Sequence, residues 1–488
     1  PSSVALLTGA QLSSVKPSFV VRDISAVRRS LFMWVLLYLA AFQAVSIAWR
    51  VRGLRGDRVL LVAAHVLTAL GFAAMISRPD PIRDLLLFPR YAEGVIAGLA
   101  IAGGLSFVNL RTSSLKALSY LPLALAFVLS LLLLSPLGSG PAGSGAKVNL
   151  GPFQPIEAIR ILLALFLAGY FSRHWELLRA VRSNQIGSLT LPGWINLPRA
   201  RYAAPVLLGV IAALALFFGQ KDLGPALMLA LVFLAAYGIA RGTVGMALTG
   251  AALLAAGFYL GYQLDISTTL ADRVRMWRAP WDNVARGGDQ IAQALWAMAT
   301  GARFGTGVGL GDTRYLPAGH TDLVLASITE ELGFAGLVAV ALLYAAVVAR
   351  ALSTARKASS DYGFFLALTL ALFLVVPVLL MMSGTLGLVP LTGVVTPFLS
   401  FGGSAMVANF AALGLLASIR SDAAPPADLA PFRVGIHWLS GGLAAASIVL
   451  LAVAGVTEIR RADELIARPH LGLQADGMRR FQYNPRLL

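Results

Sequence analysis

The chain has 488 residues, of which 58% are hydrophobic and only 13% are charged. A soluble protein of this length carries roughly a quarter charged residues, so the composition excludes an ordinary soluble enzyme. The apolar residues gather in blocks of about 17–25, long enough for a helix to cross a ~30 Å hydrocarbon core. Because a backbone in lipid must satisfy its own hydrogen bonds, these blocks are predicted to be membrane-spanning helices.

The net charge of +16 would favour a nucleic-acid partner in a soluble protein. Here much of the positive charge lies in short loops, where an excess of Lys and Arg marks the cytoplasmic side, so no nucleic-acid partner is expected. The chain has no cysteine, which excludes disulfides, thiolate zinc sites and a cysteine nucleophile. Its five histidines are scattered along the chain, so a His/Cys metal cluster is not expected.

The hydropathy pattern predicts an all-α polytopic bundle with about twelve spanning segments. In chain order these are residues 31–49, 59–77, 92–110, 116–136, 156–172, 203–219, 223–240, 244–263, 323–348, 362–386, 403–420 and 435–456. The links between them are mostly short, so neighbouring segments are expected to run antiparallel.

Arginine-rich links set the orientation, because Lys and Arg collect on the cytoplasmic side. The links that carry them are residues 50–58, 173–202 and 350–357. Alternation then places four segments outside: 137–155, 264–322, 387–402 and the tail 457–488. It also places residues 1–30 outside, although Arg28 and Arg29 lie close to the first span. Two explanations stay open for this conflict, a further helix upstream of Pro1 or an interfacial first segment.

The outer segment 264–322 is the longest predicted loop, and loops of this length are usually functional. It is rich in arginine where the orientation rule expects otherwise, with arginines at 273, 275, 278, 286, 303 and 314 facing aspartates at 265, 272, 282, 289 and 312. One interpretation is a solvated re-entrant loop with internal ion pairs. The other is a cradle for an anionic lipid head group, since the guanidinium fork suits phosphate.

The ninth predicted span, residues 323–348, has carboxylates at and near its outer end. Asp322 is placed to act on a substrate at the membrane surface, but Thr321 or Asp322 could instead cap the helix. In a continuous helix Glu330 would lie about 12 Å inward of Asp322. Glu330 and Glu331 are costly at that depth and should face protein, water or a cation, with a neighbouring arginine as one expected partner.

Taken singly, the remaining polar motifs at the membrane boundaries are explained by turn chemistry, with Gly402 and Gly403 allowing close approach or positive φ. Together they resemble the SEDS family (shape, elongation, division and sporulation), which includes RodA and FtsW. The motifs that carry the resemblance are Gln154-Pro155-Ile156-Glu157 with Arg160 after it, Lys221-Asp222-Leu223-Gly224, Gly288-Asp289-Gln290, Gly307-Val308-Gly309-Leu310-Gly311, His320-Thr321-Asp322-Leu323, Glu330-Glu331-Leu332-Gly333, Gly387-Leu388-Val389-Pro390-Leu391-Thr392-Gly393 and Pro397 through Ser404.

The chain departs from the family pattern at four positions. Ala318 stands where the family often has Glu, and Met381 stands where it tends to have Asn. Leu323 and Phe401 replace a Phe and a Tyr. The missing Glu leaves open whether a second carboxylate takes part in the chemistry.

The resemblance implies a ten-helix glycosyltransferase core at 55–420, preceded by an extra helix in 1–54 and followed by a linker and helix at 421–456. It implies polymerisation of lipid II at the outer face of the bacterial inner membrane. The 4-hydroxyl of an acceptor sugar attacks with inversion, and undecaprenyl diphosphate leaves. The alternatives are a lipid II flippase, which needs no base, and a non-catalytic scaffold.

Asp322 is the candidate general base for this reaction. Arg273, Arg275 and Arg278 are candidates for stabilising the leaving diphosphate, with a divalent cation (Mg or Mn) as an equally good hypothesis. Glu157 and Arg160 either orient the lipid or hold the helices. The other residues expected at the substrate are Gln290, His320, Thr321, Glu330, Ser400, Gly402, Gly403 and Ser404.

The tail 457–488 follows the last predicted span and is expected to face outward. It weakly resembles the membrane-proximal start of a class B penicillin-binding protein, the usual transpeptidase partner of the family. The expected partners are therefore lipid II, membrane lipids and such a penicillin-binding protein, either fused or in trans. A plain C-terminal tail is the open alternative.

Overall fold

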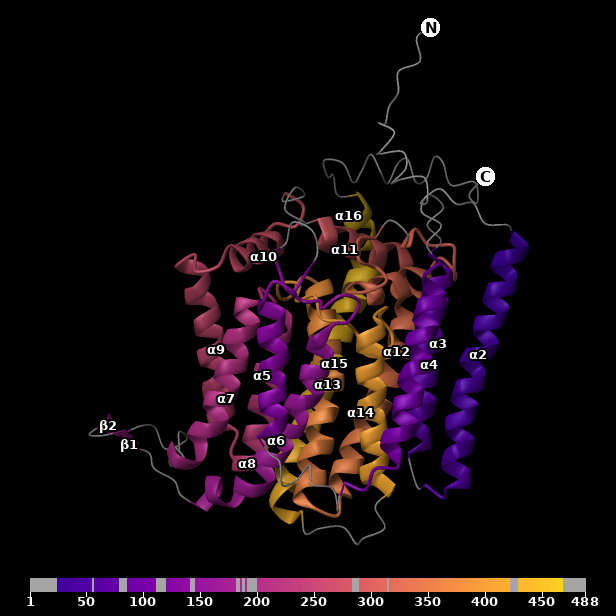
Figure 1. The fold of residues 1–488 in the computed structure, drawn as a ribbon. Helices are drawn as coiled ribbons and strands as arrows, with labels where there is room; N and C mark the ends of the chain where they lie inside the picture. Colours follow the sequence, from indigo (N-terminus) through magenta and orange to yellow (C-terminus); the bar gives the residue numbers. More distant parts are fainter. Residues whose placement is uncertain are drawn as a thin grey trace.

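A computed structural model describes residues 24–54, 57–78, 86–110, 120–140, 145–180, 185–186, 189–190, 200–282, 289–313, 316–421 and 429–467. Helices dominate this part of the chain. The exception is a hairpin of two-residue strands, β1 (Gln185–Ile186) and β2 (Leu189–Thr190), which lies to one side of the bundle (Figure 1).

A helix coincides with each predicted spanning segment, which confirms the all-α bundle. The helices are α2 (Ile24–Val51), α3 (Arg58–Ile76), α4 (Leu87–Ser106), α5 (Leu121–Leu134), α6 (Pro155–Ala180), α7 (Ala200–Gly219), α8 (Leu223–Arg241), α9 (Gly245–Gln263), α12 (Val324–Arg356), α13 (Asp361–Thr385), α14 (Gly403–Ser421) and α15 (Ala430–Gly455). They run alongside one another in Figure 1.

Ten helices in the described ranges are long and apolar enough to cross a membrane. Helix α4 is not among them and carries Arg90 and Glu93, and α5 has only 14 residues. The number of about twelve spans therefore stays a prediction, and the multi-pass membrane class is clear.

Helix α13 forms the centre of the bundle. In its most apolar window 83% of the residues are buried, against 6% for α9 and 11% for the helix that contains α15. The exposed side chains of α15 include large apolar ones, such as Val434, Trp438 and Ile448. Such an exposed apolar surface suits a lipid environment, where no water has to be displaced.

One end of the bundle carries three short helices, α10 (Thr268–Arg278), α11 (Asp289–Gly301) and α16 (Ala462–Ala467), at the top of Figure 1. We call this the outer end, following the predicted orientation. The predicted loop 264–322 is thus partly helical. Helix α10 buries Leu270, Ala271 and Val274, and the Trp277 indole N–H donates to the Gly387 carbonyl at 2.7 Å.

Helix α12 corrects the expectation of a continuous helix inward from Asp322. Its helical residues begin at Val324, and Gly333 interrupts it with φ 66° and ψ −170°. Across the break, the Phe334 N–H donates to the Ala302 carbonyl at 2.9 Å and the Gly307 N–H to the Glu331 carbonyl at 3.0 Å. The segment after α11 therefore satisfies backbone groups that the break leaves open, as buried irregular backbone in a membrane protein requires.

Gly333→Ala is expected to destabilise the protein by about 2–4 kcal/mol. A Cβ there would lie 2.4 Å from the Gly305 nitrogen, and the φ of +66° strains any L side chain. Thermal unfolding in detergent measures the loss. Gly441→Ala in α15 is the control, because a Cβ there meets nothing within 4 Å and alanine suits a helix interior. Equal stability of the two variants would contradict the strained break.

Candidate functional site

Asp322 lies in a turn at the outer end, directly before α12. Ala318, at φ 51°, accepts from the N–H groups of Thr321 (2.9 Å) and Leu323 (3.0 Å). The N-cap position of α12 is Leu323, without a side-chain cap, and the Thr321 hydroxyl donates to the Ala318 carbonyl at 3.2 Å. Neither Thr321 nor Asp322 therefore occupies the N-cap position, which was the structural alternative for this motif.

The loop before α14 fixes this turn. The Ser400 hydroxyl donates to the Thr321 carbonyl at 2.7 Å, and the Phe401 N–H donates to the His320 carbonyl at 2.7 Å. Ser400 also accepts from the Thr396 N–H at 2.8 Å. The position of Asp322 is thus set by backbone contacts on both sides of it, as a pre-organised site requires.

The Asp322 carboxylate and the Arg273 guanidinium both lie close to the bare backbone of Gly393. A Cβ built on Gly393, where φ is +71°, would lie 3.6 Å from Asp322 Oδ2 and 3.9 Å from Arg273 Nη2. Arg273 is held in place by a hydrogen bond from its Nη1 to the Leu391 carbonyl at 2.6 Å. A fixed cation and a carboxylate therefore share one small space at the outer end.

The three arginines of α10 differ in where they point. Arg273 faces Asp322, whereas the Arg275 side chain is 44% exposed and pairs with Asp272 at 3.4 Å. Arg278 is also exposed. The loop thus contains both predicted features, an internal ion pair and an arginine directed at the candidate site.

Asp222 is the neighbour that the sequence analysis left out of the site. It occupies the N-cap position of α8, yet its side chain makes no cap hydrogen bond. The turn lies directly against the loop after α13, because a Cβ on Gly224 would come 2.3 Å from the Thr392 carbonyl oxygen. The sequence analysis used this motif for the family resemblance and explained it singly by turn chemistry, but assigned Asp222 no role at the site.

The charges of this cluster act on one another. The pKa of Asp322 is raised to about 6, mainly by burial; Arg273 opposes the rise, the Asp222 charge contributes to it, and the Thr321 hydroxyl opposes it. Burial likewise raises the pKa of Asp222 to about 6, with Arg273 opposing and Glu157 adding to the rise. Burial lowers the pKa of Arg273 against the pull of both aspartates. A carboxylate with a pKa near 6 suits a general base that works near neutral pH.

Several polar atoms around the site have no hydrogen-bond partner within the described residues. They are Nδ1 of His320 and the hydroxyls of Thr392 and Thr396, all buried. Burial and the Arg78 charge lower the pKa of His320 to about 4, so its ring is neutral at pH 7. Buried polar atoms normally have partners, so these atoms are available to a polar ligand or to water.

Glu157 and Arg160 join helices beside this cluster. Arg160 Nη2 lies 2.9 Å from Glu157 Oε2 and donates to the Asn409 side-chain oxygen of α14 at 2.6 Å. The Gln154 N–H donates to the Ser404 hydroxyl, also in α14, at 3.1 Å. The helix-holding role is therefore present in the structure, and a role toward the lipid stays a prediction.

Glu330 and Glu331 lie near the break in α12, with Arg78 as the expected arginine partner. Glu330 Oε1 accepts from the Asp312 N–H at 2.8 Å. Burial lowers the pKa of Arg78 to about 10, opposed by the charges of both glutamates. Arg78 also donates to the Leu316 carbonyl at 3.0 Å. This network holds the segment that leads to the Asp322 turn.

The last predicted residues lie around this region. Gln290, partly buried, is at the start of α11. Gly402 and Gly403 do not take the positive φ that was one possibility; Phe398 does, at 64°. The close approach between α4 and α14 depends on Gly94 instead: a Cβ on Gly94 would lie 3.2 Å from the Gly403 Cα, whereas a Cβ on Gly403 would meet nothing within 4 Å.

The cluster of Asp222, Asp322 and Arg273 is also the candidate site for a divalent cation. The described ranges contain no group of three or more His, Cys, Asp or Glu side chains that could hold a metal ion. At the site itself the carboxylates are Asp222 and Asp322, and the positive charge of Arg273 already interacts with both of them. The residues present thus do not form a complete ligand set for a divalent cation.

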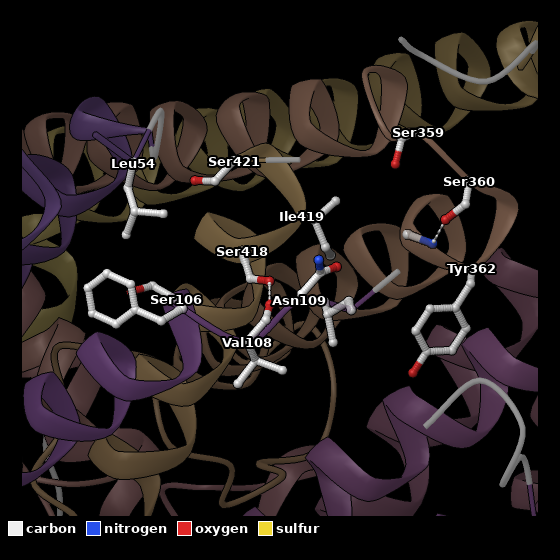
Figure 2. A pocket seen from close by; sticks show the side chains of 13 residues that line it. Leu54, Ser106, Val108, Asn109, Ser359, Ser360, Tyr362, Ser418, Ile419 and Ser421 are labelled. Atoms are coloured by element: carbon white, nitrogen blue, oxygen red, sulfur yellow. Dashed lines mark hydrogen bonds between the residues drawn. The ribbon is translucent and has the colours of Figure 1, made fainter. Parts of the chain in front are cut away.

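A separate cavity of about 330 Å³ lies at the opposite end of the bundle, around the C-terminal end of α14. Figure 2 shows its lining, which is rich in hydroxyl and amide groups. The lining includes Ser106, Asn109, Ser360, Tyr362, Ser418 and Ser421. It contains none of the residues of the Asp322 site.

The fold and the site define a class: a polytopic membrane protein with a pre-organised carboxylate and arginine at one end of its bundle. The family model for FtsW, RodA and SpoVE, described as cell cycle protein, matches residues 57–424. The chain belongs to this family, which confirms the predicted SEDS resemblance. Helices α2 and α15 lie outside the matched residues, while the predicted domain boundaries themselves stay predictions.

Named relatives agree with this assignment. The chain is 31% identical over 401 residues to the peptidoglycan glycosyltransferase RodA of Mycobacterium leprae, covering 80% of this chain and 83% of that one. It is 31% identical to the probable peptidoglycan glycosyltransferase FtsW of Thioalkalivibrio sulfidiphilus, covering 78% and 92%.

A solved structure shares the fold. It is described as structural coordination of polymerization and crosslinking by a peptidoglycan synthase complex. The match has a TM-score of 0.60 and 26% identity, and covers 76% of this chain and 98% of that one.

Proposed function

We propose that this protein is a peptidoglycan glycosyltransferase that polymerises lipid II at the outer face of the bacterial inner membrane. The observation that carries the proposal is the Asp322 carboxylate beside Arg273 over Gly393. A base and a fixed cation at the mouth of a membrane bundle are what a lipid diphosphate sugar donor needs. The names of the relatives support the same reaction.

The step assigns one role to each group. The 4-hydroxyl oxygen of the acceptor sugar forms a bond to the anomeric carbon of the donor, with inversion. The bond between that carbon and the diphosphate oxygen breaks, and undecaprenyl diphosphate leaves with the bonding electrons. The proton of the attacking hydroxyl passes to Asp322. Arg273 stabilises negative charge at the site, because a guanidinium fork pairs well with phosphate.

A divalent cation remains a further proposal for charge stabilisation. The residues around Asp322 do not form a complete ligand set, so no step above is routed through a cation. The polymerisation assay is therefore run with Mg²⁺, with Mn²⁺ and with chelator. A requirement for metal would support a cation carried by the substrate diphosphate.

A class B penicillin-binding protein is the proposed protein partner, in trans or fused at the C-terminal end. The related solved complex couples polymerisation with crosslinking. In this chain α15 lies beyond the residues matched by the family model, and the chain continues from it to α16 at the outer end. There the Trp296 indole N–H of α11 donates to the Leu465 carbonyl at 2.7 Å. That end is where a crosslinking partner for new glycan strands would be needed.

The test is reconstitution of the purified chain in vesicles with labelled lipid II. We expect glycan strands on a gel together with released undecaprenyl diphosphate. Passage of lipid II across the bilayer without strands would instead indicate a flippase. If neither strands nor transfer occurs, and adding the penicillin-binding protein yields no strands beyond those that partner makes alone, the polymerase proposal is wrong.

A further inference from the structure

Asp222 takes no part in the bond changes described above, yet it belongs to the same charge cluster as Asp322. It comes from the turn before α8, about a hundred residues earlier in the chain. The turn is pressed onto the loop 391–394, where a Cβ at Gly224 would meet the Thr392 carbonyl oxygen at 2.3 Å. The adjacent Gly393 faces both Asp322 Oδ2 and Arg273 Nη2.

A purely structural role explains Asp222 poorly. Aspartate at an N-cap usually accepts a backbone hydrogen bond from the first helical turn. The Asp222 side chain makes no such bond, although it occupies the N-cap position of α8. Its charge instead interacts with Arg273 of α10.

Arg273 interacts electrostatically with both carboxylates, and its own position is fixed by a hydrogen bond from its Nη1 to the Leu391 carbonyl at 2.6 Å. A guanidinium that paired with Asp322 alone would hold that carboxylate in a closed ion pair and weaken it as a base. A second carboxylate that interacts with the same guanidinium reduces the electrostatic attraction between Arg273 and Asp322. This second carboxylate, Asp222, comes from the N-cap position of α8.

We infer that Asp222 is a positioning residue that acts through Arg273 and keeps Asp322 available as a base. The inference rests on the proposed polymerase function. The charged groups around Asp322 are Arg273 from α10 and Asp222 from the turn before α8. The charge of Glu157 in α6 also acts on Asp222, and Glu157 is paired with Arg160. His320 next to Asp322 is neutral at pH 7.

The sign of the effect follows from these charges. The negative charge of Asp222 raises the pKa of Asp322, and Arg273 lowers it. Without the Asp222 charge, the positive charge of Arg273 interacts with Asp322 alone, so the pKa of Asp322 falls. The acid limb of the polymerisation rate then moves to lower pH, and the rate on the plateau falls because the base is weaker.

The experiment measures lipid II polymerisation from pH 5 to pH 8 by the purified full chain and by Asp222→Asn, since asparagine caps a helix as well as aspartate does. We expect the acid midpoint to move down by at least about half a pH unit and the plateau to fall several-fold. Asp222→Glu, which restores the charge, should return the midpoint toward the wild-type value. If the asparagine variant fails to fold, Asp222→Ser tests the same loss of charge, because serine is a second neutral capping residue.

Asp272→Asn is the matched control, because it removes an aspartate charge from α10 at a side chain that is 48% exposed. It should leave the midpoint unchanged. An unchanged or raised midpoint in folded Asp222→Asn and Asp222→Ser, with an active wild type, would overturn the inference and leave the polymerase function standing. An inactive wild type would instead count against the polymerase function itself.

Discussion

Asp322→Asn is expected to lower lipid II polymerisation by at least about 10²-fold, the usual contribution of a general base. The amide has nearly the shape of the carboxylate but accepts no proton at neutral pH. The turn is held by the backbone of His320 and Thr321 rather than by the Asp322 side chain, so the variant should fold. Strand formation in vesicles, with thermal unfolding beside it, measures both properties.

Asp265→Asn is the control for this variant. Asp265 lies in the same outer segment but is exposed, and its φ of 51° is one that asparagine adopts readily. It should polymerise like the wild type. Full activity of Asp322→Asn would remove Asp322 from the chemistry.

Arg273→Met is expected to lower the rate at pH 7 by about 10²-fold, the scale for loss of one fixed donor at a developing charge. Two effects combine. The leaving diphosphate loses its guanidinium, and the pKa of Asp322 rises because the charge that lowers it is gone. Less of the base is then ionised at pH 7, so part of the loss should be recovered at higher pH. The pH dependence of strand formation separates the two effects.

The other arginines of α10 provide the controls. Arg275 is half-exposed and pairs with Asp272, and Arg278 is exposed. Arg275→Met and Arg278→Met should stay within about threefold of the wild type, since exposed charges contribute little. Losses equal to that of Arg273→Met would show that the positive charge of the whole helix matters, and not one positioned guanidinium.

The spanning helices were predictable because their signal is local. A long apolar block fixes a helix in lipid whatever its neighbours are, and each predicted segment coincides with a helix of the bundle. Helices α10 and α11 were missed within the outer loop. They are short, and their burial depends on contacts such as the Trp277 indole with Gly387, which no local pattern reveals.

The break in α12 was also not predictable from the local pattern. Gly333 is one glycine in a helical run, and a glycine alone costs a helix only ~1 kcal/mol. The break is stabilised by Ala302 and Gly307, which supply hydrogen bonds from a segment about thirty residues earlier. Such a partner is visible only in three dimensions.

The sequence singled out one candidate residue of the site but not its neighbours. Asp322 was chosen from its place at the mouth of a span, with a helix cap as the alternative, together with the family resemblance of its motif, and its role stays a prediction. From the sequence, the three arginines of α10 were equally good candidates. Only Arg273 points toward Asp322, because its side chain is hydrogen-bonded to the Leu391 carbonyl. Asp222 reaches the same space through the contact of Gly224 with Thr392, a juxtaposition of segments far apart in the chain.

The measurement that tests the central claim most directly is the rate of lipid II polymerisation by the wild-type chain between pH 5 and pH 8. Asp322 must be ionised to accept the proton, and its pKa is raised to about 6. We expect a plateau near and above pH 7 and a fall approaching tenfold per unit below about pH 6. A rate that stays constant from pH 7 down to pH 5 would contradict Asp322 as the general base.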